Sequence, residues 1–237
     1  MAALTLAPGV LKVASAFPDP PFEVDPDTGF DADLIERICG MLGLRRAPVR
    51  YAGDDFDGIF AGLGREWDAV ISGTTITATR EAVARFAPPY LVFDQGVAVD
   101  TARHPGIRSV AGLKGMTVGI QRGNTSDIVA RKLLADGIIA GIRHYPYAAI
   151  GTALDDLAAG DIGAVIKLHP VLCELVKGHA GLGVVCAVPT NERIAIAVAP
   201  ANAALHDAIA AAQATIMADP WFAATRARWF GPAGAAP

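Results

Sequence analysis

Hydrophobic and polar positions along the chain alternate between short apolar runs and longer segments with one apolar face. Residues 69–71 (Ala-Val-Ile) form a short apolar run that predicts a buried strand. From about Asp31 apolar side chains recur at helical spacing, and Gly43 follows near the end, which predicts a helix. The same criteria predict strands over residues 10–14, 49–51, 93–99, 117–120, 142–145, 164–167, 184–188 and 193–198. They predict further helices over residues 56–63, 79–85, 124–135, 149–159, 171–177, 203–217 and 220–230.

The order of these elements predicts the fold class. Three strand–helix steps in succession favour a parallel sheet with helices on its faces, so we expect an α/β protein. A polar, proline-bearing break at residues 100–106 interrupts the alternation, which then starts afresh. The pattern itself fits either one doubly wound sheet or two lobes. Residues 231–237 are expected to form a disordered tail.

Composition and charge exclude several classes of protein. The chain has 237 residues, of which 52% are hydrophobic and 19% charged, so it can bury a sizeable core. Its net charge is −4 and it lacks a run of Lys and Arg, which argues against nucleic acid and anionic membranes as partners. No apolar run approaches the roughly 20 residues needed to cross a bilayer, so we expect no direct membrane insertion.

The N-terminal residues and the cysteines bear on the cellular compartment. Residues 1–13 have no charged start and too short an apolar stretch for a signal peptide, so an export signal is either removed or absent. Cys39 lies among apolar residues of a predicted helix and is expected to be a small core residue. Pairing of Cys173 with Cys186 stays open.

The stretch from Trp67 to Tyr90 carries the first candidate site. The strand at residues 69–71 ends at Ser72-Gly73, and hydroxyl residues lead from there to Arg80. A guanidinium binds a carboxylate bidentately, and free amides and hydroxyls supply further donors, so this stretch suits a carboxylate. The plainer alternative is a capped helix start with a solvated arginine.

Three segments of the sequence resemble the periplasmic binding proteins for polar amino acids, which are the family 3 solute-binding proteins with the type II fold. The stretch DAVISGTTITATR followed by FAPPY is similar to their D-x-x-x-x-G-x-T-I-T-x-x-R and F-S-x-P-Y signature. LKVASAFPDPPFEV with GFDADL resembles their first strand and first helix. LKGMTVGIQRGNTS resembles the start of their second lobe. The match is collinear over nearly the whole chain.

The resemblance implies two Rossmann-like lobes with a ligand cleft between them. Lobe 1 would be discontinuous, made of residues 1–98 and 193–237, and lobe 2 would span residues 99–192. Hinge strands at about 93–100 and 192–199 would join the lobes. Ligand would then lie at the carboxyl ends of the strands and be buried by hinge closure.

The resemblance also assigns ligand-binding roles to residues of both lobes. Arg80 matches the carboxylate clamp, and Ser72, Gly73 and Thr75 match positions that offer backbone and hydroxyl contacts. In lobe 2 the loop 123–125 ends a strand and opens a helix, and Thr125 matches a ligand-contacting position. Its neighbour Asn124 is included because free amides at a helix start favour an anion. Simple helix capping by Asn124 or Thr125 is the alternative for this loop.

Three positions depart from the family pattern. The acidic residue that the family often has just after the first strand falls on Ala16. The aspartate that pairs with the ligand's ammonium in many members falls on Leu168, which cannot pair with a cation. The aromatic residue that stacks on ligands falls on Asp19. Either Asp19 binds the cationic end of an amino acid, with Phe17 as the stacking face, or the ligand lacks an ammonium and Lys167 is a second positive contact. As a third option, Lys167 is a solvated rim residue and the alignment is shifted by one.

The resemblance implies a binding protein that delivers a small carboxylate-bearing solute, an amino acid or a similar organic acid, to an ABC transporter permease. We expect a monomer in the periplasm or at the cell surface, with its signal peptide or lipoprotein anchor removed. The common nucleophile, zinc and P-loop motifs are missing and the five histidines have no metal-ligand spacing, so we expect no enzyme, cofactor or metal. The alternatives are a cyclohexadienyl or arogenate dehydratase-like enzyme on the same fold and the ligand-sensing domain of a receptor.

Overall fold

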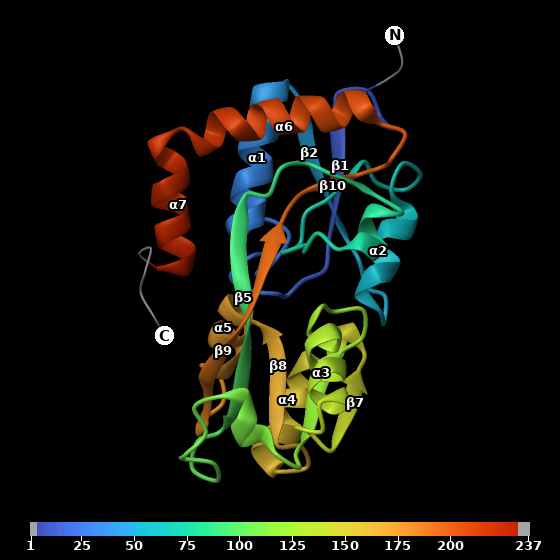
Figure 1. The fold of residues 1–237 in the computed structure, drawn as a ribbon. Helices are drawn as coiled ribbons and strands as arrows, with labels where there is room; N and C mark the ends of the chain where they lie inside the picture. Colours follow the sequence, from blue (N-terminus) through green and yellow to red (C-terminus); the bar gives the residue numbers. More distant parts are fainter. Residues whose placement is uncertain (1–3, 232–237) are drawn as a thin grey trace. The chain divides into compact units, whose positions relative to one another are not determined.

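The computed structural model describes residues 4–231, which fall into two compact units, each with its own five-stranded sheet (Figure 1). Unit 1 comprises the chain up to Ala52, Asp57–Val92 and the chain from Arg193, and unit 2 comprises Gly53–Phe56 and Phe93–Glu192. Both sheets have flanking helices, so the predicted α/β class is confirmed. The predicted tail at residues 232–237 lies outside the described residues.

Unit 1 is built on the sheet order β2-β1-β3-β10-β4. Its elements are β1 (Val10–Ser15), α1 (Phe30–Leu42), β2 (Arg45–Arg50), the 3₁₀ helix Phe56–Gly62 that enters it from unit 2, β3 (Ala69–Val70), α2 (Ala78–Glu81), β4 (Arg85–Phe86), β10 (Ala197–Val198), α6 (Ala203–Met217) and α7 (Pro220–Phe230). Strand β1 is parallel to β2 and β3, whereas β10 is antiparallel to β3 and β4. The carboxyl ends of β1 and β3 are therefore neighbours.

The C-terminal helices complete unit 1. Helix α6 packs against α1, and α7 turns away from the end of α6 and also contacts α1 (Figure 1). Phe30 at the start of α1 is fully buried and stacks near Tyr90, with Phe222 and Phe230 of α7 packed edge-on. Backbone hydrogen bonds from Phe30 N to the Pro21 carbonyl and from Asp31 N to the Phe22 carbonyl hold the start of α1 to the loop that follows β1.

Unit 2 repeats this arrangement with the sheet order β7-β6-β8-β5-β9. Its elements are β5 (Leu91–Asp100), the 3₁₀ helix Val110–Leu113, β6 (Thr117–Gln121), α3 (Ser126–Ala135), β7 (Gly141–Tyr145), the 3₁₀ helix Tyr147–Ala149, α4 (Ile150–Ala159), β8 (Ala164–Leu168), α5 (His169–Val176) and β9 (Leu182–Ile194). Strand β6 is parallel to β7 and β8, and β5 is antiparallel to β8. The carboxyl ends of β6 and β8 are thus neighbours.

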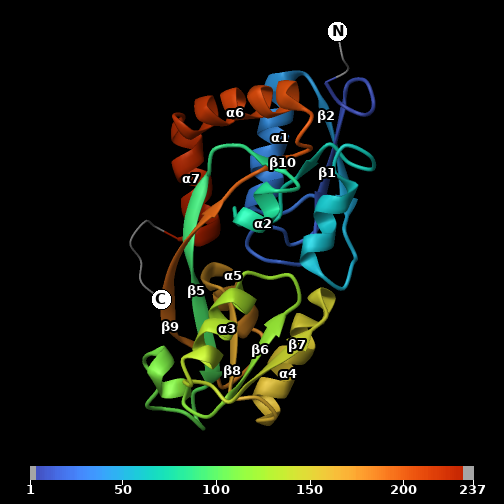
Figure 2. The same ribbon diagram turned by 45° about the vertical axis from the view of Figure 1, so that its right-hand side comes forward.

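Two apolar clusters cover the two faces of the unit 2 sheet, one with residues of α3 and the other with residues of α4. Figure 2 shows these two helices beside the sheet. On one face Val129 and Leu133 of α3 pack against Ile166 of β8. On the other face Leu154 of α4 packs against Val165, the preceding residue of the same strand. Successive strand residues point to opposite faces, so this alternation leaves β8 buried on both sides.

The structure corrects several predicted boundaries. The helix expected over 79–85 is a single short turn, α2, because Arg85–Phe86 pairs instead with β10. The segment 56–63 is a 3₁₀ helix rather than an α-helix. The second strand begins at Arg45, earlier than expected, because the whole of β2 pairs with β1. The runs at 184–188 and 193–198 are one long strand, β9, followed by the short β10.

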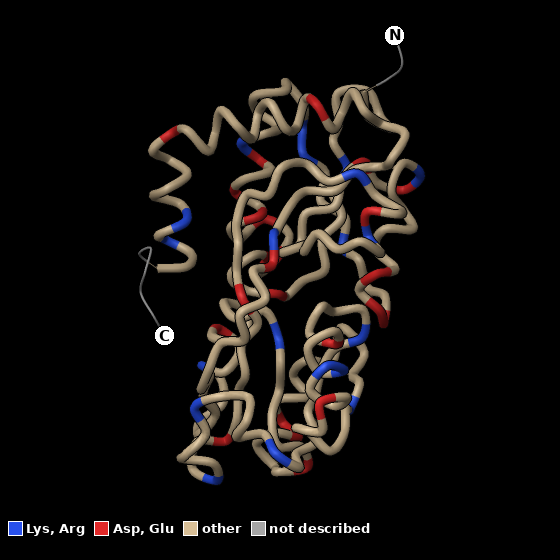
Figure 3. The backbone as a smooth tube through the Cα atoms, in the orientation of Figure 1, with Lys and Arg blue, Asp and Glu red and all other residues tan. Residues whose placement is uncertain are grey.

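Lysine, arginine and acidic residues are interspersed along both units (Figure 3). In residues 4–231 no helix has the length and apolar character that a membrane span requires.

Candidate functional site

In unit 1 the loops leaving β1 and β3 are joined by hydroxyl side chains. The Ser72 hydroxyl is buried and accepts a hydrogen bond from the Ala16 backbone N–H at 3.0 Å. The hydroxyl of Ser15, the last residue of β1, donates to the Ile71 carbonyl at 2.7 Å. Ser72 therefore helps to hold the two strand ends together.

Gly73 lies in a left-handed conformation that favours glycine. Its φ is +53°, and a Cβ atom there would lie 3.0 Å from the Phe22 ring. The Gly73 N–H donates to Asp31 Oδ2 at 2.7 Å, and the Tyr90 hydroxyl donates to Asp31 Oδ1 at 2.7 Å. Since Asp31 already binds this amide, a ligand contact at Gly73 would use its carbonyl.

Replacing Gly73 with alanine should destabilise unit 1 in two ways. The left-handed backbone costs an L-residue about 1–2 kcal/mol, and the close approach to Phe22 adds to that cost. Gly115, with a φ of +76° and open space around it, is the matched control because Gly115→Ala incurs only the backbone cost. We expect urea denaturation to show a larger loss of unfolding free energy for Gly73→Ala, and equal losses would contradict this packing.

Arg80 is buried, with 4% of its surface exposed, so the solvated-arginine alternative is wrong. Its backbone N–H donates to Thr77 Oγ1, which caps α2. Its Nε donates to Asp57 Oδ1 at 2.9 Å, its Nη1 to the Thr75 carbonyl at 2.9 Å, and its guanidinium lies 5.5 Å from the Phe60 ring centroid. These contacts fix the guanidinium beside the chain that leaves β3. Thr75 itself is buried and forms an isolated bridge with Ile194.

Three buried carboxyl groups, those of Asp19, Glu23 and Asp31, lie in the loop that follows β1 and at the start of α1. Burial raises the pKa of Glu23 to about 9, and the nearby Asp31 adds to the rise. Burial also raises the pKa of Asp31 to about 7, although hydrogen bonds from Gly73 and Tyr90 oppose it. The charge of Asp19, itself 6% exposed, raises the pKa of Asp31 further. At neutral pH Glu23 is therefore protonated.

These pKa values predict a stability that falls as the pH rises. Unfolded Glu23 releases its proton near its ordinary pKa of 4.5, while the folded chain keeps it up to a pKa of about 9. Between these values the folded state binds more protons, so the unfolding free energy decreases by up to about 1.4 kcal/mol per pH unit. Glu23→Gln should flatten this slope in urea denaturation between pH 5 and 9. An unchanged slope would contradict a buried, protonated Glu23, and Glu81→Gln on the exposed side of α2 is the control.

The proposed stacking face, Phe17, is half-buried and already has a cationic neighbour. The guanidinium carbon of Arg50 lies 5.3 Å from the Phe17 ring centroid, so Arg50 covers one face of the ring. The neighbouring Asp19 is held by its backbone, because Asp19 N donates to the Glu23 carbonyl at 2.6 Å. A ligand stacking on Phe17 would use the other face of the ring.

In unit 2 Lys167 lies at the carboxyl end of β8 and is 1% exposed, so it is not a solvated rim residue. Its Nζ donates to Gln121 Oε1 at 2.7 Å and lies 5.4 Å from the Tyr147 ring centroid. Gln121, the last residue of β6, also donates to the Tyr147 carbonyl and accepts from Asn124 Nδ2 at 3.2 Å. Lys167 and Asn124 therefore share Gln121 as a partner.

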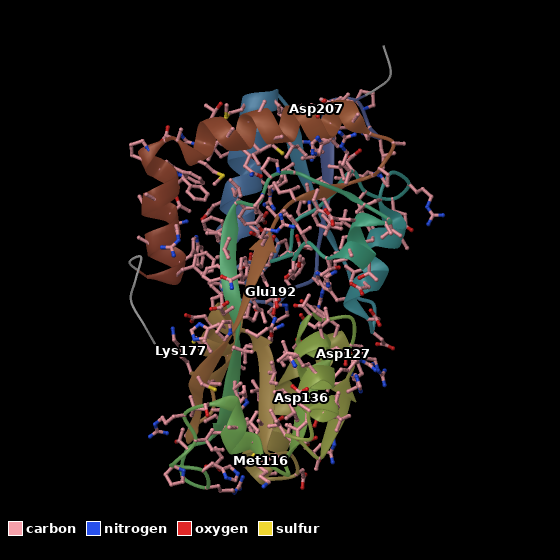
Figure 4. All side chains as sticks on the ribbon, in the orientation of Figure 1. Met116, Asp127, Asp136, Lys177, Glu192 and Asp207 are labelled. Atoms are coloured by element: carbon pink, nitrogen blue, oxygen red, sulfur yellow. The ribbon has the colours of Figure 1, made fainter. Side chains whose placement is uncertain are left out.

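Thr125, a predicted residue, belongs to a second polar group. Its two partners in this group, Gln95 and Glu192, are not predicted from the sequence. Its hydroxyl donates to Glu192 Oε2 at 2.7 Å and accepts from Gln95 Nε2 at 3.1 Å. Gln95 Nε2 also donates to Glu192 Oε1 at 2.7 Å. Glu192 lies near the end of β9 and is labelled in Figure 4. No motif marks Gln95 or Glu192, since strand pairing brings together residues that are 97 positions apart.

The expected contact residues of unit 2 thus lie on both faces of its sheet. Gln95 pairs in register with Leu168, which is 6% exposed, and Gly96 pairs with Lys167. Because successive strand residues point to opposite faces, Gln95 and Lys167 lie on opposite sides of the sheet. Leu168 is a buried apolar neighbour of Gln95.

The cysteine alternatives are decided by the structure of the described residues. Cys39, Cys173 and Cys186 are all free thiols, so a Cys173–Cys186 disulfide is not formed. Cys39 is buried in α1 as expected. Within residues 4–231 no group of three His, Cys, Asp or Glu side chains is arranged to hold a metal ion.

Comparison with known families identifies the class of the protein. The family model of the bacterial extracellular solute-binding proteins, family 3, matches residues 11–232. The chain therefore belongs to this family, as its sequence motifs predict.

One relative and two solved structures illustrate the similarity. The chain is 30% identical over 221 residues to ABC transporter arginine-binding protein 1 of Escherichia coli (strain K12), covering 89% of this chain and 86% of that protein. An ancestral arginine-binding protein bound to arginine has a TM-score of 0.84 at 30% identity, covering 94% and 99% of the two chains. An ancestral amino acid-binding protein described as a precursor of cyclohexadienyl dehydratase has a TM-score of 0.81 at 26% identity, covering 94% and 95%.

These comparisons confirm the predicted two-lobed periplasmic binding protein fold. The relatives are binding proteins, and this chain is likewise a solute-binding protein rather than an enzyme. The structure related to the dehydratase is itself named an amino acid-binding protein.

Proposed function

We propose that this protein delivers an amino acid, or an organic acid of similar size, to an ABC importer and binds it by its carboxylate. The names of the relatives support this proposal. The Escherichia coli relative is named for an ABC transporter and for arginine, and the two similar structures are named as arginine- and amino acid-binding proteins. The permease of the importer would be the protein partner.

The observation that carries the proposal is the buried guanidinium of Arg80, which lies in α2 and binds the Thr75 carbonyl in the chain that leaves β3. A guanidinium presents its N–H groups in a planar fork that matches a carboxylate. Arg80 already binds the Asp57 carboxylate, whose side chain is 51% exposed. This ion pair supports the proposal, because the ligand carboxylate would share or take over the contact that Asp57 makes with Arg80.

The remaining predicted residues would complete the site. Ser72, Gly73 and Thr75 follow β3 and would line the carboxylate in unit 1. Asn124, Thr125 and Lys167 would approach from unit 2 when the two units close around segments 93–100 and 192–199. Closure would remove the ligand from water and so strengthen its charge-assisted hydrogen bonds.

The proposal includes a location and an oligomeric state. Members of this family are named as extracellular proteins, and we propose that this chain acts in the periplasm or at the cell surface as a monomer. Size-exclusion chromatography with light scattering tests the monomer.

A thermal-shift screen of the ligand-stripped protein tests the function. The panels are the L-amino acids and small acids that lack an ammonium group. A ligand present at about 100 times its dissociation constant should add about 2.7 kcal/mol of stability. A shift with at least one carboxylate-bearing compound is expected, and silence from both panels would overturn the proposal.

A further inference from the structure

We propose that Glu192 and Gln95 form a subsite for the ammonium group of an amino acid in unit 2. This inference rests on the proposed function, since it names the second charged group of the same ligand. Many family members pair the ammonium with an aspartate at the position of Leu168, and a leucine side chain cannot do so. The proposed subsite would supply the partner that Leu168 does not.

The first observation is a buried hydrogen-bond acceptor. Gln95 is fully buried, and in the described part of the chain its Oε1 has no hydrogen-bond partner. The orientation of the amide follows from its neighbours, because Nε2 donates to the carboxylate oxygen Glu192 Oε1 at 2.7 Å. A carboxylate oxygen accepts hydrogen bonds, so the donating NH₂ must face Glu192 and the orphaned atom is the carbonyl oxygen.

The second observation is the acidic side chain beside this acceptor. Glu192 is 7% exposed and accepts hydrogen bonds from Thr125 and Gln95. A carboxylate at this depth lies in a medium of low dielectric constant, where it attracts a cation more strongly than it would in water. An ammonium supplies both a positive charge and three N–H donors, and it could bind Glu192 and Gln95 Oε1 together.

The backbone places Glu192 next to Gln95. Asp94 Oδ1 accepts hydrogen bonds from the backbone N–H groups of Thr190 at 2.9 Å and Asn191 at 2.8 Å. Gln95 N donates to Thr190 Oγ1 at 3.1 Å, and Asn191 has a left-handed φ of 50°. These hydrogen bonds hold the end of β9 against β5. The side chains of Gln95 and Glu192 therefore meet in a fixed geometry.

The place of this pair in the sheet fits a ligand contact. Gln95 lies opposite Leu168 at the carboxyl end of β8, and ligands of open α/β sheets bind beyond the carboxyl ends of their strands. Lys167 lies on the other side of the sheet, where Gln121 binds it, so its positive charge does not face Gln95.

Matched pairs of probes test the subsite by titration calorimetry on the full chain. Each pair is an L-amino acid and the acid that lacks only its amino group. The pairs are L-arginine with 5-guanidinopentanoate, L-glutamate with glutarate, L-leucine with 4-methylpentanoate, and L-phenylalanine with 3-phenylpropanoate. The wild-type protein should bind the amino acid of at least one pair about tenfold or more tightly than its partner, as expected for a charge-assisted contact.

Glu192→Gln keeps the shape of the side chain and removes its charge. It should reduce this preference to about twofold or less, mainly by lowering the affinity for the amino acid. Gln95→Met removes the orphaned oxygen and should also reduce the preference, which keeps the proposal testable if one variant does not fold. Glu174→Gln and Gln213→Leu are the controls. Gln213 is also buried with an unpartnered Oε1, but its Nε2 binds the Pro88 carbonyl in unit 1.

The outcomes separate this inference from the proposed function. If Glu192→Gln lowered the affinity for both members of a pair equally, Glu192 would have a merely structural role and the subsite would be overturned. Wild-type binding of only the ammonium-free acids would overturn the subsite and leave a carboxylate-binding protein. Binding of none of the eight probes would overturn the subsite, and silence from both thermal-shift panels as well would overturn the proposed function.

Discussion

Replacing Arg80 with alanine should lower the affinity for the amino acid that gives the largest thermal shift by roughly 10- to 150-fold. The change removes a charge-assisted contact worth about 1.5–3 kcal/mol. The guanidinium also binds the Thr75 carbonyl and Asp57, so the stability of the variant must be measured as well. Titration calorimetry on the folded variant measures the affinity.

Arg85→Ala is the matched control for Arg80→Ala. Arg85 lies five residues further along, on β4, and its side chain is exposed. Its replacement should leave the affinity unchanged within about twofold, since it removes the same positive charge without touching the proposed site. Unchanged affinity in Arg80→Ala itself would show that the ligand binds elsewhere.

Replacing Phe22 with alanine should cost about 3–5 kcal/mol of unfolding free energy, as large-to-small changes of buried aromatic residues do. Phe22 is fully buried between the chain near Gly73 and the C-terminal helix, where its ring centroid lies 5.2 Å from that of Phe230. The loss of the ring would free the loop after β1 and the turn at Gly73 together. Affinity should therefore fall along with stability.

Val24→Ala is the control in the same loop, because Val24 is 40% exposed. Its cost should stay within about 0.5 kcal/mol. Urea denaturation of both variants measures the difference. A small loss in Phe22→Ala would contradict the role of Phe22 as the support of the Gly73 turn.

Local signals in the sequence predict much of the fold. Gly160 ends α4 in the left-handed conformation that its glycine allows, and Asp219 caps α7 with Pro220 at the first helical position. The sequence predicts both because capping depends on neighbouring residues. The segment 79–85 departs from its prediction because the partner of Arg85–Phe86 is β10, more than a hundred residues away in the chain.

Some residues of the candidate site are also marked by local sequence signals, whereas others come together only in the folded chain. Arg80 and Gly73 lie in a contiguous motif, so the sequence indicates them directly. Gln95 and Glu192 carry no motif and become neighbours only through the pairing of β5 with β9. The burial of Lys167 is likewise beyond the reach of the sequence, since a lysine after an apolar run is as compatible with a rim position as with its contact to Gln121.

The most direct test of the account is a calorimetric titration of the ligand-stripped protein with one amino acid in two forms. The amino acid that gives the largest thermal shift is compared with its methyl ester, which keeps the ammonium and the side chain but has no carboxylate. Binding through Arg80 predicts that the ester binds at least about tenfold more weakly. Equal affinity for the ester and the free amino acid would contradict recognition of the carboxylate.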